Sequence, residues 1–274
     1  MRAKEKFLFS IRIIAILIIT VCVMFPLYWG LTTSFKRPAD ISVIPPQWFF
    51  QPSLFSWKTI FFEWGIMYFM KNSLIVSSIA TFLTVGIGSL AAYAISRFKF
   101  YMRKGITFDI LTLKMIPPIV TAIPLFLIAK QWGLHNTYSF LIMIYITFNL
   151  PFVILVMKSF IDELPKELDE AALADGCNRF QAFYKVILPL TAPGVFCCLI
   201  LTYIFCWNEF LFANIFTMGK HRTLSIAVAL SFKQRAVAWG PAAAVSIFVI
   251  IPIVILSLVV SKHIVRGMTL GAIK

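Results

Sequence analysis

Acidic residues are scarce in this sequence. Asp and Glu number 11 against 25 Lys and Arg, and the four charged types together make up only 13% of the 274 residues. Apolar residues make up 60%, and the mean hydropathy is +0.90. So little charge on so apolar a chain excludes a soluble globular domain and indicates an integral membrane protein.

Signs of a nucleic-acid, metal or nucleotide site are also missing. No stretch interleaves basic and aromatic residues as base stacking requires, so the net charge of +14 indicates positive-inside loops and contact with membrane lipid rather than nucleic acid. The three His are isolated, and no G-x-x-x-x-G-K-[S/T] phosphate loop is present. We therefore expect no metal, no cofactor and no catalysis in this chain. The five Cys, in neither metal nor disulfide spacing, are predicted to be buried thiols: Cys22, Cys177, Cys197, Cys198 and Cys206.

Apolar runs are abundant, and they predict the fold. An all-α integral membrane protein is expected, with six transmembrane helices and both termini inside, because Lys and Arg are more numerous on that side. Residues 1–71 would hold the first span and an outer segment rich in aromatics and proline, and residues 72–274 would hold the core with spans two to six. The expected spans are about 11–31, 72–96, 106–129, 137–157, 192–216 and 240–262.

Small residues recur every fourth position in the second span, which predicts a close packing face for another helix. They are Ala80, Thr84, Gly88, Ala92 and Ser96.

Polar groups inside the other spans are candidates for a translocation path, because charges in a membrane are costly and usually functional. Lys114 is one, although pairing with a neighbouring subunit or snorkelling to the interface would also explain it. Asn149 stands two residues before Pro151 and either faces a pathway or accompanies a simple kink in the helix. Asn208 and Glu209 could bind a hydroxyl-rich solute and Trp207 could stack on a sugar, or the three could serve hydrogen bonding between helices and interfacial anchoring.

One stretch, residues 158–190, gathers the negative charge that the rest of the chain lacks. Six of the 11 acidic residues fall between Asp162 and Asp175. We expect a helix over about 165–175, a left-handed residue at Gly176, and a capping box formed by Asn178 and Gln181 at the start of a second helix. The second helix would present apolar residues on one face: Phe180, Phe183, Tyr184 and Ile187.

This stretch, which we call the acidic segment, resembles a family motif. E-A-A-L-A-D-G followed by I-L-P is similar to the E-A-A-x-x-x-G and I-x-L-P loop of the membrane subunits of bacterial ABC importers. The resemblance implies that this cytoplasmic loop, between spans four and five, is the coupling helix that docks on an ATPase subunit. The residues that would carry this role are Glu170, Ala171, Ala172, Asp175 and Gly176.

Further motifs follow in order over about 200 residues and are similar to the second permease subunit of maltose-type carbohydrate importers. They include A-A-Y-A, W-N-E-F, W-G-P-A-A-A and the ending R-G-M-T-L-G-A-I-K, in which Met268 and Ile273 depart mildly from the usual pattern. The resemblance implies a multi-pass subunit of a bacterial inner membrane that moves a carbohydrate by alternating access.

The expected partners are a homologous second permease, two ATPase subunits that bind ATP and Mg²⁺, and an extracytoplasmic solute-binding protein. The outer loop 217–239 would reach the binding protein. Its candidate contacts, matched by position only, are Lys233, Gln234, Arg235 and Trp239.

Two other functions remain open at this point. An ABC importer could carry a polyamine, an oxyanion, an amino acid or a glycerol phosphate. A stand-alone secondary transporter or channel is a different class, but it predicts inverted repeats or a relay of intramembrane carboxylates. The sequence has no repeated half, and only Asp109, Lys114 and Glu209 are embedded charges.

Overall fold

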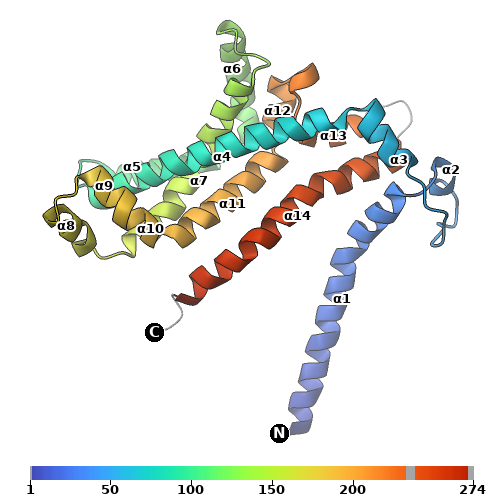
Figure 1. Ribbon diagram of the computed structural model, residues 1–274, viewed down its shortest axis with the longest axis horizontal. Helices are drawn as coiled ribbons and strands as arrows, with labels where there is room; N and C mark the ends of the chain where they lie inside the picture. Colours follow the sequence, from blue (N-terminus) through green and yellow to red (C-terminus); the bar gives the residue numbers. More distant parts are fainter. Residues whose placement is uncertain (1, 233–237, 271–274) are drawn as a thin grey trace. The chain divides into compact units, whose positions relative to one another are not determined.

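The computed structural model describes residues 2–232 and 238–270, and every regular element in these ranges is helical (Figure 1). The chain divides into two compact units. Unit 1 comprises Met1–Met67 and Ala227–Ile251, and unit 2 comprises Tyr68–Ile226 and Pro252–Lys274.

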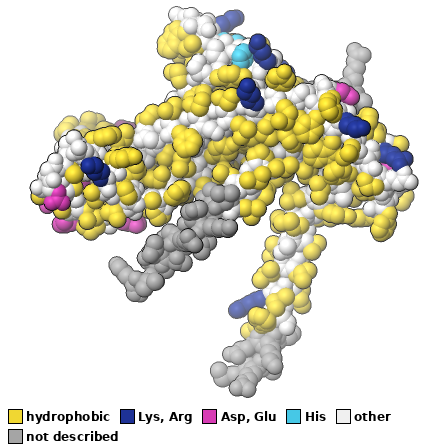
Figure 2. All heavy atoms as spheres, in the orientation of Figure 1, with side chains coloured by type: hydrophobic (Ala, Val, Ile, Leu, Met, Phe, Trp, Pro, Cys, Tyr) yellow, Lys and Arg dark blue, Asp and Glu magenta, His cyan; other side chains and the backbone are white. Residues whose placement is uncertain are grey.

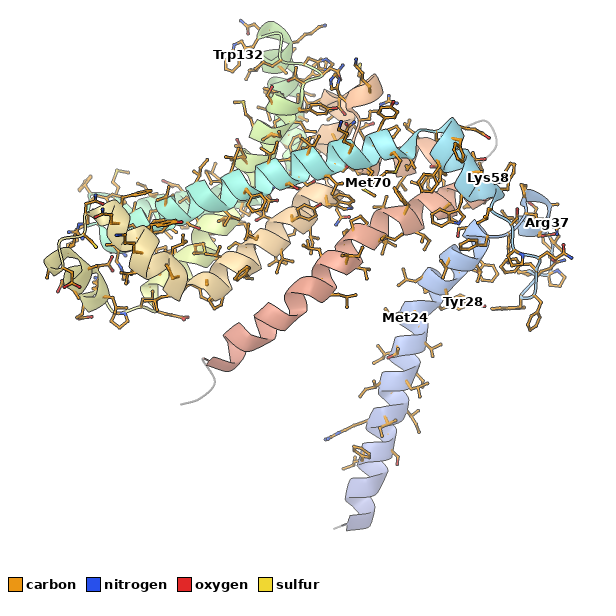
Figure 3. The ribbon with its side chains drawn as sticks, viewed as in Figure 1. Met24, Tyr28, Arg37, Lys58, Met70 and Trp132 are labelled. Carbon is orange, nitrogen blue, oxygen red and sulfur yellow. The ribbon has the colours of Figure 1, made fainter. Side chains whose placement is uncertain are left out.

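Unit 1 begins with the long helix α1, Arg2–Ser34. Within α1, Leu8–Ser34 is a candidate membrane span with none of its most apolar window buried in the protein. Met24 and Tyr28 project from this helix with about half of their surface exposed (Figure 3). The remaining described elements of unit 1 are α2 (Pro38–Ile41), α3 (Phe55–Lys58), the π-helix η1 (Thr59–Glu63), and parts of α13 (Leu224–Ser231) and α14 (Trp239–Leu270).

Unit 2 contains a hydrophobic core. Its long helices are α4 (Ile66–Arg97, all but the first two residues), α5 (Arg103–Met115), α6 (Pro118–Gln131), α7 (Tyr138–Asp162) and α11 (Ala192–Asn208). Its short helices are α8 (Glu167–Ala174), α9 (Arg179–Ala182), η2 (Phe183–Ile187), α10 (Leu188–Leu190), α12 (Leu211–Phe216) and η3 (Gly219–His221).

The core of unit 2 forms where α4, α7 and α11 meet. Val85 and Ala92 from α4 pack with Val153 and Met157 from α7 and with Cys198 from α11. The predicted packing face of the second span is confirmed, because all five of its small residues are buried: Ala80, Thr84, Gly88, Ala92 and Ser96.

The described residues contain four helices long and apolar enough to cross a membrane, or up to six if each of two bent pairs is one span. The third predicted span folds as two helices, because the chain turns by 91° between α5 and α6. Ile116 is extended there (φ −68°, ψ 122°), as expected for a residue before the proline pair Pro117–Pro118. The fifth predicted span ends early, at Asn208, and a separate short helix follows.

The prediction of buried thiols is correct for only two of the five cysteines. Cys198 and Cys206 are buried, whereas Cys177 and Cys197 are partly exposed. Cys22 is exposed, since it lies on α1, whose apolar surface is not covered by the rest of the chain.

Candidate functional site

The acidic segment folds largely as its sequence predicts. Its first helix, α8, lies within the expected range. Gly176 adopts φ +84°, the left-handed conformation in which a side chain would be strained. Asn178 and Gln181 form the predicted capping box, each side chain accepting a hydrogen bond from the other residue's backbone N–H, at 2.8 and 2.9 Å.

The second part of the segment differs from the prediction in its helix type and its faces. After one turn of α9, the chain continues as the π-helix η2. Phe183 and Ile187 are buried, but Phe180 and Tyr184 are each more than 60% exposed. The widened turn therefore divides the expected single apolar face into a core-facing pair and an exposed aromatic pair.

One face of α8 is open, and it carries most of the residues that the sequence singles out. Glu167, Glu170, Ala171 and Ala174 are exposed at i, i+3, i+4 and i+7 spacing, so they lie along one side of the helix. Asp175 and Gly176 follow, also exposed. On the face of unit 2 seen in Figure 2, acidic side chains gather at the end that carries α8.

Of the five residues predicted to dock on an ATPase subunit, Ala172 differs from the others. It is 6% exposed and faces the body of unit 2 rather than outward. Its small side chain lets α8 lie close to the underlying helices.

Asp169 anchors the buried side of α8. Its carboxylate lies 2.7 Å from Arg97 Nε and accepts a hydrogen bond of 2.6 Å from the Tyr93 hydroxyl. Arg97 also donates from Nη2 to the carbonyl of Leu164, at 3.0 Å. The Arg97 and Asp169 side chains are only 4% and 5% exposed, so the two charges neutralise each other away from water. This cluster, which we call the inner clamp, ties residues 164–169 to the end of α4.

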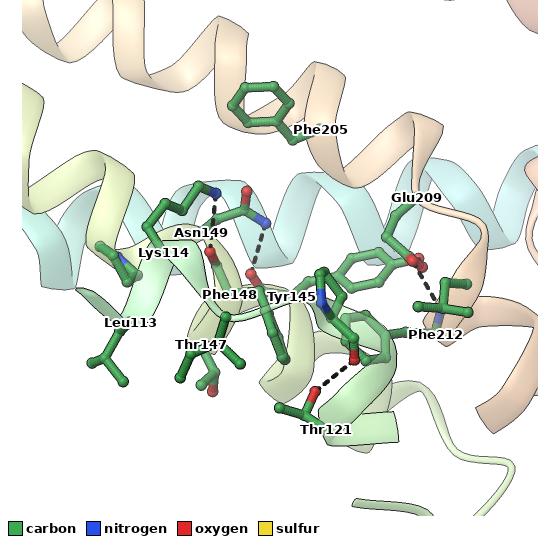
Figure 4. Close-up of a pocket in the computed structure, with 14 residues that line it drawn as sticks. Leu113, Lys114, Thr121, Tyr145, Thr147, Phe148, Asn149, Phe205, Glu209 and Phe212 are labelled. Atoms are coloured by element: carbon green, nitrogen blue, oxygen red, sulfur yellow. Dashed lines mark hydrogen bonds between the residues drawn. The ribbon is translucent and has the colours of Figure 1, made fainter. Parts of the chain in front are cut away.

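A second site is a cavity of about 520 Å³ among α5, α6, α7, α11 and the start of α12 (Figure 4). Lys114, Asn149 and Glu209, three of the predicted pathway residues, line it. Its other lining residues are Leu113, Ile116, Pro118, Thr121, Tyr145, Thr147, Phe148, Pro151, Phe205, Leu211 and Phe212.

Lys114 is weakly held within this cavity. Its Nζ donates to the Phe148 carbonyl at a long 3.4 Å and lies 5.6 Å from the centre of the Phe205 ring. The lysine also lies in the last turn of α5, where a positive charge is favourable against the helix dipole. An ammonium with such loose contacts can reorient toward a polar solute in the cavity.

Glu209, by contrast, is fully engaged with its own chain. Its carboxylate accepts hydrogen bonds from the backbone N–H groups of Phe212 (2.8 Å) and Ala213 (3.0 Å). The hydroxyl of Tyr145 donates a third hydrogen bond, at 3.0 Å. Because the first turn of a helix has no internal partners for its N–H groups, Glu209 holds the start of α12 in place.

The other predicted pathway residues lie away from the cavity lining. Trp207 is 1% exposed, and its ring stacks on Tyr203 with 5.8 Å between ring centres. Asn208 is exposed, and its amide donates to the Ile204 carbonyl of its own helix at 3.0 Å. Stacking of Trp207 on a sugar therefore has no support in the geometry.

The outer loop 217–239, predicted to reach the binding protein, is described only in part. Lys233, Gln234 and Arg235 lie outside the described residues. Trp239 begins α14, is 57% exposed, and meets the ring of Phe232 edge-on at 6.2 Å.

Sequence reasoning missed several residues that build these sites. Asp169 stands directly before the E-A-A motif, and its burial could have been inferred from the helical period, three positions before Ala172. Tyr93 belongs to the A-A-Y-A motif and Arg97 ends the same helix, but no local pattern indicated their partner. Nothing in the sequence around Tyr145 indicated its role, because that role depends on a contact with Glu209, 64 residues away.

Together, the membrane-length helices, the cavity in unit 2 that contains charged side chains and the exposed acidic helix α8 define a multi-pass membrane transport subunit. The chain belongs to the family of binding-protein-dependent transport system inner membrane components, whose model matches residues 84–270. The family predicted from the acidic segment is thereby confirmed.

Characterised relatives resemble the chain over nearly its whole length. The trehalose/maltose transport system permease protein MalG of Thermococcus litoralis is 36% identical over 278 residues, covering 99% of both chains. The sulfoquinovosyl glycerol transport system permease protein SmoH of Agrobacterium fabrum is 35% identical over 266 residues, covering 96% of this chain and 93% of the relative.

Solved structures show the same fold. A chain of a bacterial ABC transporter involved in the import of the acidic polysaccharide alginate matches with a TM-score of 0.83 at 18% identity, covering 95% of this chain and 97% of the other. A chain of the MetNI methionine ABC transporter matches with a TM-score of 0.59 at 14% identity, covering 79% of this chain and 99% of the other.

Proposed function

We propose that this chain is a permease subunit of an ABC importer and forms half of the translocation path for a carbohydrate. The printed functions of its relatives, transport of trehalose and maltose and of sulfoquinovosyl glycerol, support the substrate class. Within the complex, the chain pairs with a homologous second permease in the cell membrane. Two ATPase subunits bind ATP and Mg²⁺, and an extracytoplasmic binding protein delivers the solute.

The observation that carries this proposal is the arrangement of α8. Buried Asp169 fixes one side of the helix to α4, while Glu170 and Ala171 are presented on the opposite, open side. Small alanines allow a partner helix or groove to approach closely, and a carboxylate offers a basic partner residue an ion pair. This open face, with Asp175 and Gly176 at its end, is the docking surface for an ATPase subunit.

The cavity around Lys114 is this subunit's share of the translocation path. Its volume falls within the 300–1,000 Å³ that is typical of small-molecule sites. Lys114 and Thr121 are among the residues that bring polar groups into a mostly apolar wall, which suits hydroxyl-rich solutes that also present an apolar ring face. Closure and reopening of the ATPase pair, transmitted through α8, would expose such a site to each side of the membrane in turn.

Affinity purification of the tagged chain from native membranes in mild detergent tests the proposal. We expect a P-loop ATPase and a second, different permease to be retained, and a sugar to be released from the binding protein that accompanies them. Recovery of the chain alone, even after gentle crosslinking, would contradict the proposed function. Recovery of the complex with a polyamine or an oxyanion would contradict the carbohydrate assignment only.

A further inference from the structure

Helix α4 is held by polar contacts at both of its ends within unit 2. The inner clamp, formed by Tyr93 and Arg97, lies at its C-terminal end. At the other end, Asn72 Nδ2 donates to the backbone carbonyls of Lys220 (2.8 Å) and Arg222 (2.7 Å). We call the contacts of Asn72 and its neighbour Ser73 the outer clamp.

The outer clamp is as well built as the inner one. Ser73 Oγ accepts a hydrogen bond of 2.7 Å from the backbone N–H of Leu224, and the Tyr138 hydroxyl donates to Asn72 Oδ1, also at 2.7 Å. Asn72 and Ser73 are 5% and 1% exposed, and Leu224 is fully buried. Residues 220–224 are therefore fixed to α4 by hydrogen bonds that water cannot easily replace.

The two clamps are separated by more than the thickness of a membrane's hydrocarbon core. Asn72 and Arg97 are 25 positions apart on one continuous helix. At 1.5 Å per residue they are separated by roughly 38 Å, more than the roughly 30 Å of a bilayer's hydrocarbon core.

The helix between the clamps is suited to move as one piece. Within residues 2–232 and 238–270, α4 is the only one of the four candidate spanning helices that has no internal proline; α1, α7 and α14 contain Pro26, Pro151 and Pro252. The two bent pairs are broken outright, by 91° and 81°. Kinks in helices arise mainly at prolines and at Gly/Ser pairs. Helix α4 has no proline, and its Gly88–Ser89 pair is buried, with Gly88 packed against Val153 of α7.

We propose that α4 is a strut that couples the docking helix α8 to residues 220–224 on the other side of the membrane. A shift of α8 is passed to α4 through the inner clamp, because Arg97 and the Tyr93 hydroxyl both hold the Asp169 carboxylate and separating them would leave buried polar groups unpaired. The outer clamp then passes the shift to residues 220–224. The coupling is reciprocal, so a partner bound at residues 220–224 biases α8 by the same free energy.

This inference rests on the proposed function for the partners at the two ends, and one assay addresses both. The complex purified from native membranes is reconstituted in lipid nanodiscs, and its ATPase rate is measured with and without the co-purified binding protein. The variants are Ser73→Ala in the outer clamp, Tyr93→Phe in the inner clamp, and the double variant. Ser159→Ala and Tyr101→Phe are the matched controls, because the Ser159 hydroxyl donates to Leu155 of its own helix and Tyr101 is 93% exposed.

Each single clamp variant should lower the stimulation by the binding protein by about fivefold or more, the lower bound of typical allosteric coupling. The double variant should be no more than about twofold worse than the more impaired single variant, because weakening either clamp already loosens the connection through the strut. The inference would be overturned if the fold-losses of the two single variants multiplied in the double variant, or if either single variant kept normal stimulation. Both results would leave the importer assignment intact. Should Ser73→Ala fail to assemble, Tyr138→Phe weakens the same clamp.

A second measurement does not depend on an ATPase being present. The Leu224 N–H is protected by Ser73, so its hydrogen exchange in nanodiscs reports on the outer clamp. Tyr93→Phe should accelerate exchange at residues 222–226 by about fivefold or more, whereas Tyr101→Phe should not. Unchanged exchange in Tyr93→Phe would show that the two ends of α4 are independent.

Discussion

Gly88 of α4 lies directly against Val153 of α7, and a Cβ at Gly88 would stand only 2.6 Å from Val153 Cγ1 and 2.9 Å from its Cβ. Gly88→Ala should therefore push α4 and α7 apart and destabilise unit 2 by about 1–3 kcal/mol, the usual cost of overpacking. Thermal unfolding in detergent checks this. Gly86→Ala is the matched control, because nothing lies within 4 Å of its added Cβ. Equal melting temperatures for the two variants would contradict the packing described.

The buried ion pair between Arg97 and Asp169 predicts a second pattern of stability. Asp169→Asn should destabilise the protein by about 3–5 kcal/mol, because Arg97 is left as an uncompensated buried charge. Replacing both charges, as Arg97→Met with Asp169→Leu, should restore most of that loss. Thermal unfolding of the single and double variants is the measurement. A double variant less stable than Asp169→Asn would mean that the pair is not desolvated as the structure shows.

The open face of α8 predicts a defect in assembly without a defect in folding. Glu170→Lys reverses an exposed charge, so the melting temperature should stay near that of the wild type. Binding of the ATPase should weaken by about tenfold or more, since like charges facing each other across an interface cost several kcal/mol. Co-purification and solute uptake are the readouts.

Glu163→Lys is the control for this variant, since it makes the same charge change just after α7 and outside α8.

Gly176→Asp should also uncouple uptake from ATP hydrolysis, because the φ of +84° at Gly176 disfavours a side chain and the end of α8 would shift. Normal uptake in both Glu170→Lys and Gly176→Asp would refute the docking assignment.

The two charged residues of the cavity should respond differently to neutralisation. Lys114→Met should leave stability nearly unchanged but lower uptake about tenfold, the loss expected for one hydrogen bond to a charged group. Glu209→Gln should instead lower stability by about 1–2 kcal/mol, because an amide cannot accept all the hydrogen bonds that the carboxylate receives. Unfolding and uptake measured on the same preparations separate the two roles. A stability loss in Lys114→Met with normal uptake would make that lysine structural.

The sequence predicted best those features that depend on neighbouring residues. Gly176, the Asn178–Gln181 capping box and the bounds of α8 follow from chemistry within a few positions. The small-residue face of α4 was predictable as well, since a period of four is a property of one helix.

Features that depend on distant residues could not be predicted in this way. The sequence singled out Lys114, Asn149 and Glu209 one at a time, but their meeting in one cavity follows from the packing of several helices. Periodicity likewise could not show that Trp207 is buried within unit 2, or that Asp169 meets Arg97. The π-helix η2 was missed because hydrophobic spacing alone does not distinguish it from an α-helix.

The 91° break between α5 and α6 also bears on how this subunit is made. Carbonyls at the end of α5 and N–H groups at the start of α6 lack helical partners, and hydrocarbon offers them none. In either arrangement, a broken span or a re-entrant loop, this part of the chain needs protein or water around it to be stable. A partner subunit that covers this break would therefore stabilise a newly synthesised copy. We expect unassembled copies to be substrates for membrane proteases, with the amount in the cell set by the supply of partners.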